Sequence, residues 1–349
     1  MYKMHWNHMW RGIALLAIFT LCLSVFSPAS PALATKPGSG STTGSARVFL
    51  PNPVAFLQDQ NLTDQKDADY PALGPAYQDV TLTNLDGSGY LRGDWATVVS
   101  ETGNPAYSPT NAFLYNRHDD EFEQVMAYFW ITEAQKYIQS LGFDGVNRRA
   151  INKVSQHVRI NQWGLDNSFS TSHKDEIRYG KGGVDDAEDA EVILHEYGHS
   201  MQGSQNPNLV YSGETGGIME GFSDYWAAEV SNLIAPTPDP ACIADWDSTS
   251  YTSNVPHCLR RLDTNLHYPD DITASVHHNG LLWSQALWEI RTTLDNDTAD
   301  TMILEAQFSF APASTMPQAA QVTVDTAQNW YGSAVAKIVH DAFAARGIL

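Results

Sequence analysis

Two histidines four residues apart, in the segment AEVILHEYGHSMQ (190–202), constrain the fold more than any other feature of the 349-residue chain. The apolar residues around them recur at helical spacing. Four residues of an α-helix turn through about 400° and rise about 6 Å, so His195 and His199 leave the same face one turn apart. Two imidazoles in this arrangement can bind one zinc ion. The segment therefore predicts a helix that carries part of a metal site.

Glu196 follows the first of these histidines, so on the same helix it would point beside a metal ion rather than at it. A general base that takes a proton from zinc-activated water must stand in this position. Chance alone would place about 0.015 such five-residue patterns in a chain of this composition. Coincidence is therefore a poor explanation of the pattern.

A second segment, GIMEGFSDYW (217–226), places two carboxylates one helical turn apart, on Glu220 and Asp224. One of them can bind the metal while the other accepts the free ring N–H of a metal-binding histidine. Taken alone, such a pair is more often a solvated helix face. The aromatic neighbours Phe222 and Trp226 argue against a solvated face here.

A third segment, VHHNGLLWSQALW (276–288), places His277 and His278 at the start of another helical pattern. A histidine in this position can be an ordinary cap or core residue. It can also donate a hydrogen bond to an oxyanion that develops during a reaction. The residues alone leave both interpretations open.

The first residues of the chain differ from the rest. An apolar run at 13–26 follows basic residues, and residues 32–34 (ALA) have the small side chains that a signal peptidase requires. An uncleaved anchor is the alternative, but the run is shorter than the roughly 20 residues of a spanning helix. We expect residues 1–34 to be a secretory signal peptide, 35–45 to be a flexible linker, and the protein to be secreted without stable membrane insertion.

Charge excludes one class of partner. The chain has 20 basic and 40 acidic residues, and the signal peptide contains only Lys3 and Arg11 of these, so the mature chain carries a net charge of −22. Nucleic acid is therefore not expected as a partner.

Cys242 and Cys258 are the cysteines that remain after processing. In an exported protein this even number favours a disulfide over two free thiols.

The order of the patterns predicts an α+β fold. A β-rich part with one long helix occupies 46–190, and a mainly helical part that carries the candidate metal ligands occupies 191–349. We expect the active-site cleft between these two parts. Helices are predicted at 119–141, 189–202, 217–233, 275–294 and 334–346, and strands at 166–169 and 176–180, among others.

HEYGH, MEGFSDYWA and VHHNGLLWSQALW, in this order, resemble the motifs of the gluzincin metallopeptidases, and most of all those of the fungalysin family and its short bacterial relatives. The resemblance covers most of the chain from Ala46. It implies a thermolysin-like catalytic domain and a zinc (Zn²⁺) endopeptidase that acts on protein or peptide substrates. We expect a monomer.

Carried over residue by residue, the resemblance implies the roles of the site residues. The zinc ligands would be His195, His199 and Glu220, with Glu196 as the general base and Asp224 orienting the first histidine. His277 rather than His278 would stabilise the tetrahedral intermediate together with Tyr211. Asn167 and Ser168 would bind the substrate backbone, and Arg260, or its neighbour Arg261, a substrate carbonyl.

Calcium (Ca²⁺) is a further candidate cofactor. An acidic run directly before the first metal-binding helix offers carboxylate ligands, at Asp185, Asp186, Glu188, Asp189 and Glu191. Acidic residues at a helix N-terminus are also favourable without any metal.

Two alternatives to the peptidase function remain, namely a secreted binding protein on a peptidase-like fold and a zinc hydrolase of a non-peptide bond.

Overall fold

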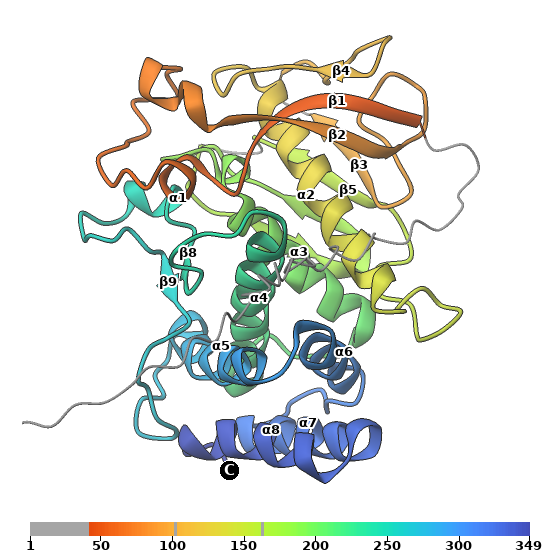
Figure 1. Ribbon diagram of the computed structural model, residues 1–349, viewed down its shortest axis with the longest axis vertical. Coiled ribbons are helices and arrows are strands. Elements are labelled where there is room, and N and C mark those ends of the chain that lie inside the picture. The colour runs from red at the N-terminus through yellow and green to blue at the C-terminus, as the bar shows by residue number, and fades with distance from the viewer. Residues whose placement is uncertain (1–41, 101–102, 162–163) are drawn as a thin grey trace, which may run out of the picture. The chain divides into compact units, whose positions relative to one another are not determined.

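The computed structural model describes residues 42–100, 103–161 and 164–349 (Figure 1). The signal peptide predicted at 1–34 lies outside the described residues, and so does most of the predicted linker. Within the described part of the chain, no helix is long and apolar enough to cross a membrane.

The linker prediction is wrong for residues 42–45. These residues begin strand β1 (Thr42–Phe49), which pairs along its length with the antiparallel strand β2 (Tyr77–Leu85). The backbone N–H of Ser45 also donates to the carbonyl of Asn111 (2.9 Å). Ladder hydrogen bonds therefore order a segment whose composition alone is typical of a linker.

The larger sheets lie in the first half of the chain, as expected. Their other strands are β3 (Ala96–Ser100), β4 (Ala112–Phe113), β5 (Gln156–Ile160), β6 (Phe169–Thr171) and β7 (Glu176–Arg178). One sheet has the order β2-β1-β4 and the other β3-β5-β7-β6. In the second sheet β6 pairs antiparallel with β7 and forms the edge, whereas β3, β5 and β7 are parallel. Of the strand predicted at 166–169, only Phe169 belongs to β6.

The long helix predicted at 119–141 is α2 (Glu121–Ser140). It contacts β1, β3 and the helix α3 (Ala190–Gln205). Most of its side chains are buried, including those of Val125 and Ile138. One continuous hydrophobic cluster extends from these residues into α3 and the later helices, so the β-rich and helical parts share a core.

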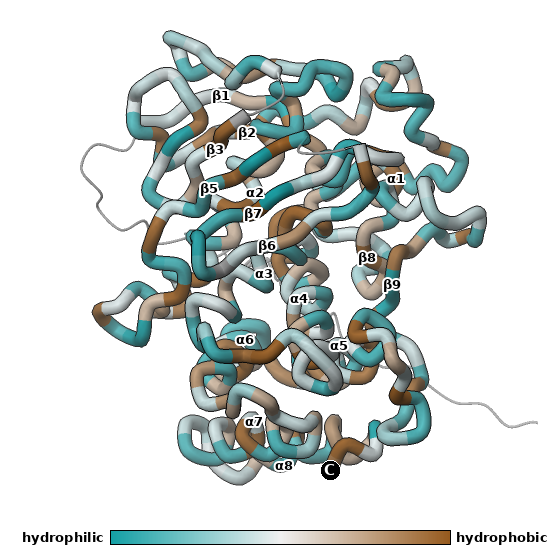
Figure 2. Tube along the Cα trace, turned by 180° about the vertical axis from the view of Figure 1, so that it is seen from behind, coloured by the Kyte–Doolittle hydropathy of each residue, from teal (hydrophilic) through white to brown (hydrophobic). Residues whose placement is uncertain are grey.

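The helices after α3 are α4 (Gly213–Ile234), α5 (Val276–Thr293), α6 (Asn296–Gln307), α7 (Met316–Tyr331) and α8 (Ser333–Ala345). In Figure 1, α3 and α4 lie between the strands and α5 to α8. Figure 2 shows hydrophobic and hydrophilic positions mixed along α7 and α8, as expected for helices with one face on the core. Helices α6 and α7 were not predicted from the sequence.

Two glycines allow the three helices of the candidate site to approach closely. A Cβ atom on Gly198 of α3 would lie 2.9 Å from Cα of Ser223 on α4. A Cβ atom on Gly221 of α4 would lie 2.4 Å from the carbonyl oxygen of Gly280 on α5. Side chains beside these contacts, such as Glu220, are therefore brought against residues of both neighbouring helices.

Cys242 and Cys258, which are 16 positions apart in the sequence, are joined by a disulfide. It lies beside the short ladder of β8 (Cys242–Ile243) and β9 (Arg260–Arg261). Replacing both cysteines with serine is expected to lower the free energy of unfolding by about 3 kcal/mol, because the unfolded chain gains loop freedom. Urea denaturation of the two proteins measures the difference, and an unchanged free energy would contradict the expectation.

Candidate active site

Helix α3 presents three of the predicted site residues from one turn. Its N-terminus is capped by Asp189, whose Oδ1 accepts the backbone N–H of Glu191 (3.0 Å). The ring centroids of His195 and His199 are 4.8 Å apart. Both imidazoles therefore lie on the face of α3 that contacts α4, as their spacing predicted.

Glu220 of α4 lies between the two imidazoles. Its Oε2 is 3.4 Å from His195 Nε2, and its Oε1 is 3.3 Å from His199 Nε2. Zinc binds nitrogen and oxygen ligands tetrahedrally at about 2.0–2.1 Å, which places two ligand atoms about 3.3–3.4 Å apart. The spacing of the three side chains therefore fits one zinc ion.

The electrostatics of these residues also fit a cation. The buried Oε2 of Glu220 meets no hydrogen-bond donor among the described residues. Burial opposes charge on His195, but the nearby carboxylates of Asp224 and Glu220 raise the pKa of His195 to about 10. Burial likewise opposes charge on Glu220, yet both histidines hold the pKa of Glu220 well below its usual range. The site thus favours a positive charge, which a zinc ion supplies.

Asp224 contacts the ring nitrogen of His195 that points away from Glu220. Its Oδ1 is 2.8 Å from His195 Nδ1, so it can accept the ring N–H and leave Nε2 facing Glu220. Arg260 donates to both oxygens of Asp224, from Nε and Nη2, each at 2.7 Å. Burial would raise the pKa of Asp224, but Arg260 and His195 lower it. Asp224 is therefore a fixed anion at the site.

The two candidate arginines, Arg260 and Arg261, have different surroundings. Arg260 lines the cleft beside His195 and Glu196. Arg261 pairs instead with Asp239 and Asp263, in each case at 2.7 Å. Arg260 is therefore the arginine brought to the site, although its link to Asp224 gave no signal in the sequence.

Replacing Asp224 with asparagine is expected to weaken zinc binding about 10–100-fold, the range found when an outer partner of a metal-binding histidine is lost. The amide cannot form the charged pair with Arg260, and it orients the imidazole of His195 less firmly. Competition with a chromophoric chelator measures the affinity. Asp263→Asn, on the exposed partner of Arg261, is the control, and equal affinity in the two variants would contradict the role of Asp224.

Tyr211 and His277 lie on the open side of the candidate ligands. The hydroxyl of Tyr211 donates to Oε1 of Glu220, and burial with the charge of Glu220 raises the pKa of Tyr211, so the hydroxyl stays protonated. Nε2 of His277 is 3.4 Å from Oε2 of Glu220, and burial lowers the pKa of His277. Their side chains stay half-exposed, so both can reach a substrate.

These residues border a cavity of about 420 Å³. Asn167 and Ser168, which precede the edge strand β6, also line it, and so does His277 rather than His278. Ser168 is held by its hydroxyl, which donates to Asp186. All the predicted catalytic and metal-binding residues line this cavity together with Asn167 and Ser168, whereas Arg260 lines the adjoining cleft and Asp224 lies behind His195. The apolar lining of the cavity by Phe169, Leu209 and Met219 was not predicted.

The chain is similar to known metallopeptidases. The family model of the fungalysin metallopeptidases (M36) matches residues 104–348. Extracellular metalloproteinase 4 of Trichophyton rubrum is 31% identical over 115 residues, which are 29% of this chain and 17% of that protein. The protein of the same name from Trichophyton soudanense is 31% identical over 28% of its own length. The chain thus matches only a minor part of these relatives.

A solved structure shows a similar fold. The precursor of protealysin, a metalloproteinase from Serratia proteamaculans, superposes with a TM-score of 0.54 over 76% of this chain and 90% of that one. The sequence identity is 15%, so the likeness concerns the fold alone. It confirms the predicted thermolysin-like α+β architecture.

Proposed function

The chain belongs to the fungalysin metallopeptidase family, and from this membership we propose that it is a secreted zinc-dependent endopeptidase. The observation that carries the proposal is the set of His195, His199 and Glu220 at zinc-ligand spacing beside Glu196, on the wall of an open cavity. Secretion is supported by the signal peptide predicted from the sequence and by relatives named as extracellular.

Glu196 is the proposed general base. Bound at the three ligands, zinc would supply Lewis acidity, which polarises a carbonyl and lets water act as a nucleophile at neutral pH. Oε2 of Glu196 is buried without a hydrogen-bond donor in the described part of the chain, and burial raises the pKa of Glu196. A carboxylate with a raised pKa can accept the proton of the attacking water and pass it to the leaving amine.

The other cleft residues would bind and orient the substrate. Tyr211 and His277 can donate hydrogen bonds to the oxyanion, because the hydroxyl of Tyr211 stays protonated and the neutral imidazole of His277 still carries one N–H. Strand β6 forms the sheet edge beside the cavity, so an extended peptide can add to it as a further strand near Asn167 and Ser168. Arg260, held in place by Asp224, would donate to a substrate carbonyl.

The two rival functions have weaker support. A structural zinc site normally has four protein ligands, whereas the cluster within the described residues has three and faces a cavity. This open position favours catalysis over a binding protein with structural zinc. A zinc hydrolase of a non-peptide bond would use the same groups, but the edge strand beside the cavity favours an extended peptide.

Incubation of the purified mature chain with casein and with a quenched peptide library tests the proposal. We expect cleavage that a chelator stops, and mass spectrometry should identify internal peptide bonds as the sites of cleavage. Zinc bound at one ion per chain without chelator-sensitive cleavage would contradict the peptidase function and favour the binding protein.

A further inference from the structure

The acidic run before α3 does not form one metal site, because its side chains point to different partners. Glu188 accepts from Arg117 Nε (2.9 Å) and from Trp246 Nε1 (3.0 Å). Glu191 accepts from the hydroxyl of Ser231 and from the backbone of Ala244. Asp189 caps α3, and Asp186 accepts from Ser168. In the described residues, the buried Oδ2 of Asp185 has no hydrogen-bonded partner, and Asp186 has one at Oδ2 but none at its buried Oδ1.

Asp185 meets two carboxylates from distant parts of the chain. One belongs to Glu123, in the first turn of α2, and the other to Asp67, in the loop before the 3-10 helix η1 (Pro71–Ala76). One oxygen from each of the three side chains lies within 4.8 Å of the others. Glu123 and Asp185 are only 1% and 3% exposed. Three separate segments thus converge on one buried point.

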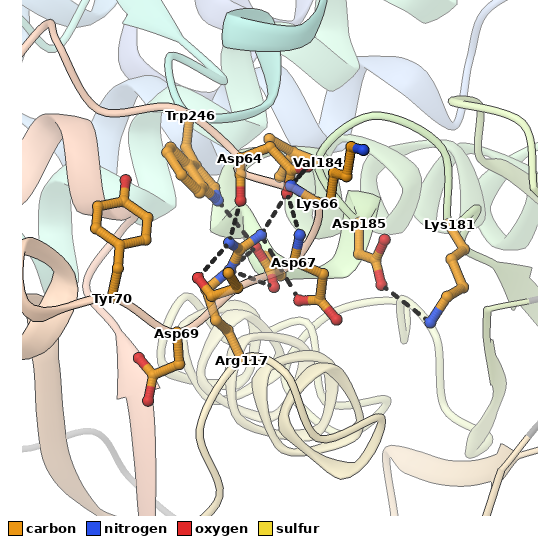
Figure 3. A network of polar contacts seen from close by, with 12 residues as sticks. Asp64, Lys66, Asp67, Asp69, Tyr70, Arg117, Lys181, Val184, Asp185 and Trp246 are labelled. Atoms are coloured by element: carbon orange, nitrogen blue, oxygen red, sulfur yellow. Dashed lines mark hydrogen bonds and ion pairs between the residues drawn. The ribbon is translucent and has the colours of Figure 1, made fainter.

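The carboxylates at this point lack hydrogen-bond donors. Both oxygens of Glu123, Oδ1 of Asp67 and Oδ2 of Asp185 are buried without one, as far as the structure describes the chain. The nearest cationic groups are too distant for a hydrogen bond. Arg117 Nη2 is 3.7 Å from Oδ1 of Asp67, and Lys181 Nζ is 3.7 Å from Oδ2 of Asp185. Figure 3 shows Arg117 in contact with both Asp64 and Asp67, and Lys181 in contact with Asp185.

Negative charge exceeds positive charge around the cluster. The acids are Asp64, Asp67, Glu123, Asp185 and Glu188, and the cations are Arg117 and Lys181. A buried carboxylate without a partner is costly, and the N-terminus of α2 can offset only part of this cost for Glu123. Burial and neighbouring carboxylates raise the pKa of Asp185 to about 8 and that of Glu123 above its usual range. A bound cation would remove this repulsion.

We propose that Asp67, Glu123 and Asp185 bind a calcium ion that ties the loop before η1 and the start of α2 to the segment leading into α3. Calcium takes oxygen ligands at about 2.3–2.6 Å, so two opposite ligand atoms can lie about 4.6–5.2 Å apart, which suits this cluster. Calcium also tolerates an irregular set of ligands, whereas magnesium demands a near-octahedral one. The ion acts on the stability of the zinc-binding helix and not on the reaction.

A second carboxylate cluster provides the matched control. Asp166, Asp186 and Asp247 also approach one another within 4.8 Å. Here, however, hydroxyl groups already donate to two of the acids, from Tyr251 to Asp166 and from Ser168 to Asp186. In the described residues, Oδ1 of Asp186 and Oδ1 of Asp247 are also buried without a donor, so the two clusters differ in the hydroxyl groups that donate to Asp166 and Asp186.

The test uses the mature chain with Glu196→Gln, to prevent self-digestion, loaded with one equivalent of zinc in calcium-free buffer. Isothermal titration with calcium chloride should show one bound ion per chain. Calcium at about 1 mM should raise the unfolding temperature by about 5 °C, because the ion binds only the folded state. Glu123→Gln and Asp67→Asn should each lose the heat and the shift, whereas Asp247→Asn should keep both.

The unfolding temperature of Glu123→Gln, measured with and without calcium, distinguishes a calcium ligand from a residue that only stabilises the fold. Without calcium this variant should unfold no lower than the parent, because it removes a buried unpaired charge, yet it should gain nothing from calcium. The Asp67→Asn variant is expected to fold normally, because asparagine readily adopts the positive φ of 62° at this position. The proposal is overturned by the absence of calcium binding, by loss of binding in Asp247→Asn alone, or by an equal shift with magnesium chloride.

Discussion

Replacing Glu196 with glutamine is expected to lower kcat/KM for a peptide substrate by about 10³-fold, within the range of a general base, while zinc stays bound. Glutamine has the size of glutamate but cannot accept the proton of the attacking water. The zinc ligands His195 and His199 are untouched, so a metal content of one ion per chain is expected. Steady-state hydrolysis of a quenched peptide and elemental analysis of the same sample measure both quantities.

The unfolding temperature separates this effect from misfolding. Glu196 is buried with an oxygen that meets no donor in residues 42–100, 103–161 and 164–349, so Glu196→Gln should unfold no lower than the parent. Glu133→Gln, on α2 and paired with Lys136, is the matched control and should keep full activity. Loss of zinc in Glu196→Gln would make Glu196 a ligand, and retained activity would exclude it as the base.

Removing a ligand is expected to have the second large effect. Glu220→Ala and His199→Ala should each weaken zinc binding by well over about 100-fold, the upper end of the loss when only an outer partner is removed. Hydrolysis should fall with zinc occupancy in both variants. Titration against a chromophoric chelator, followed by the peptide assay at saturating zinc, measures the two effects.

His277→Ala is the sharpest control for the ligand set. Its imidazole is as close to Glu220 as that of His195, with 3.4 Å between the closest atoms in each case, yet we assign it to the oxyanion and not to zinc. The variant should keep zinc affinity and lose turnover. A loss of zinc equal to that of His199→Ala would contradict this assignment.

The local part of the site could be predicted from the sequence because helical geometry fixes it. A spacing of four residues decides that His195 and His199 share a face, whatever the rest of the fold does. Glu220 and Asp224 could be predicted in the same way, but only as a pair on a second helix. Their approach to α3 depends on close helix contacts, at Gly198 and elsewhere, that the motif itself does not show.

The long-range part could not be predicted. The choice between Arg260 and Arg261 depends on the partners that each finds, Asp224 for one and Asp239 with Asp263 for the other. Likewise, no sequence pattern joins Asp67 and Glu123 to Asp185, because three segments meet there only in the folded chain.

The errors in secondary structure have local causes. Residues 42–45 look like a linker, but pairing with β2 overrides their composition. Helix α7 was missed although a signal was present, since Thr315 and Gln318 form a capping box and a proline follows in the first turn. Helix α6 follows α5 almost directly, and its mixed polar composition gave a weak helical pattern.

Stepwise return of zinc to the metal-free mature chain tests the central claim most directly. The chain is stripped with a chelator, dialysed, and titrated with zinc while hydrolysis of a quenched peptide is followed. We predict no activity without metal and a linear rise that ends at one equivalent of zinc. Activity that survives complete removal of zinc, or one tightly bound zinc without peptide cleavage, would contradict the account.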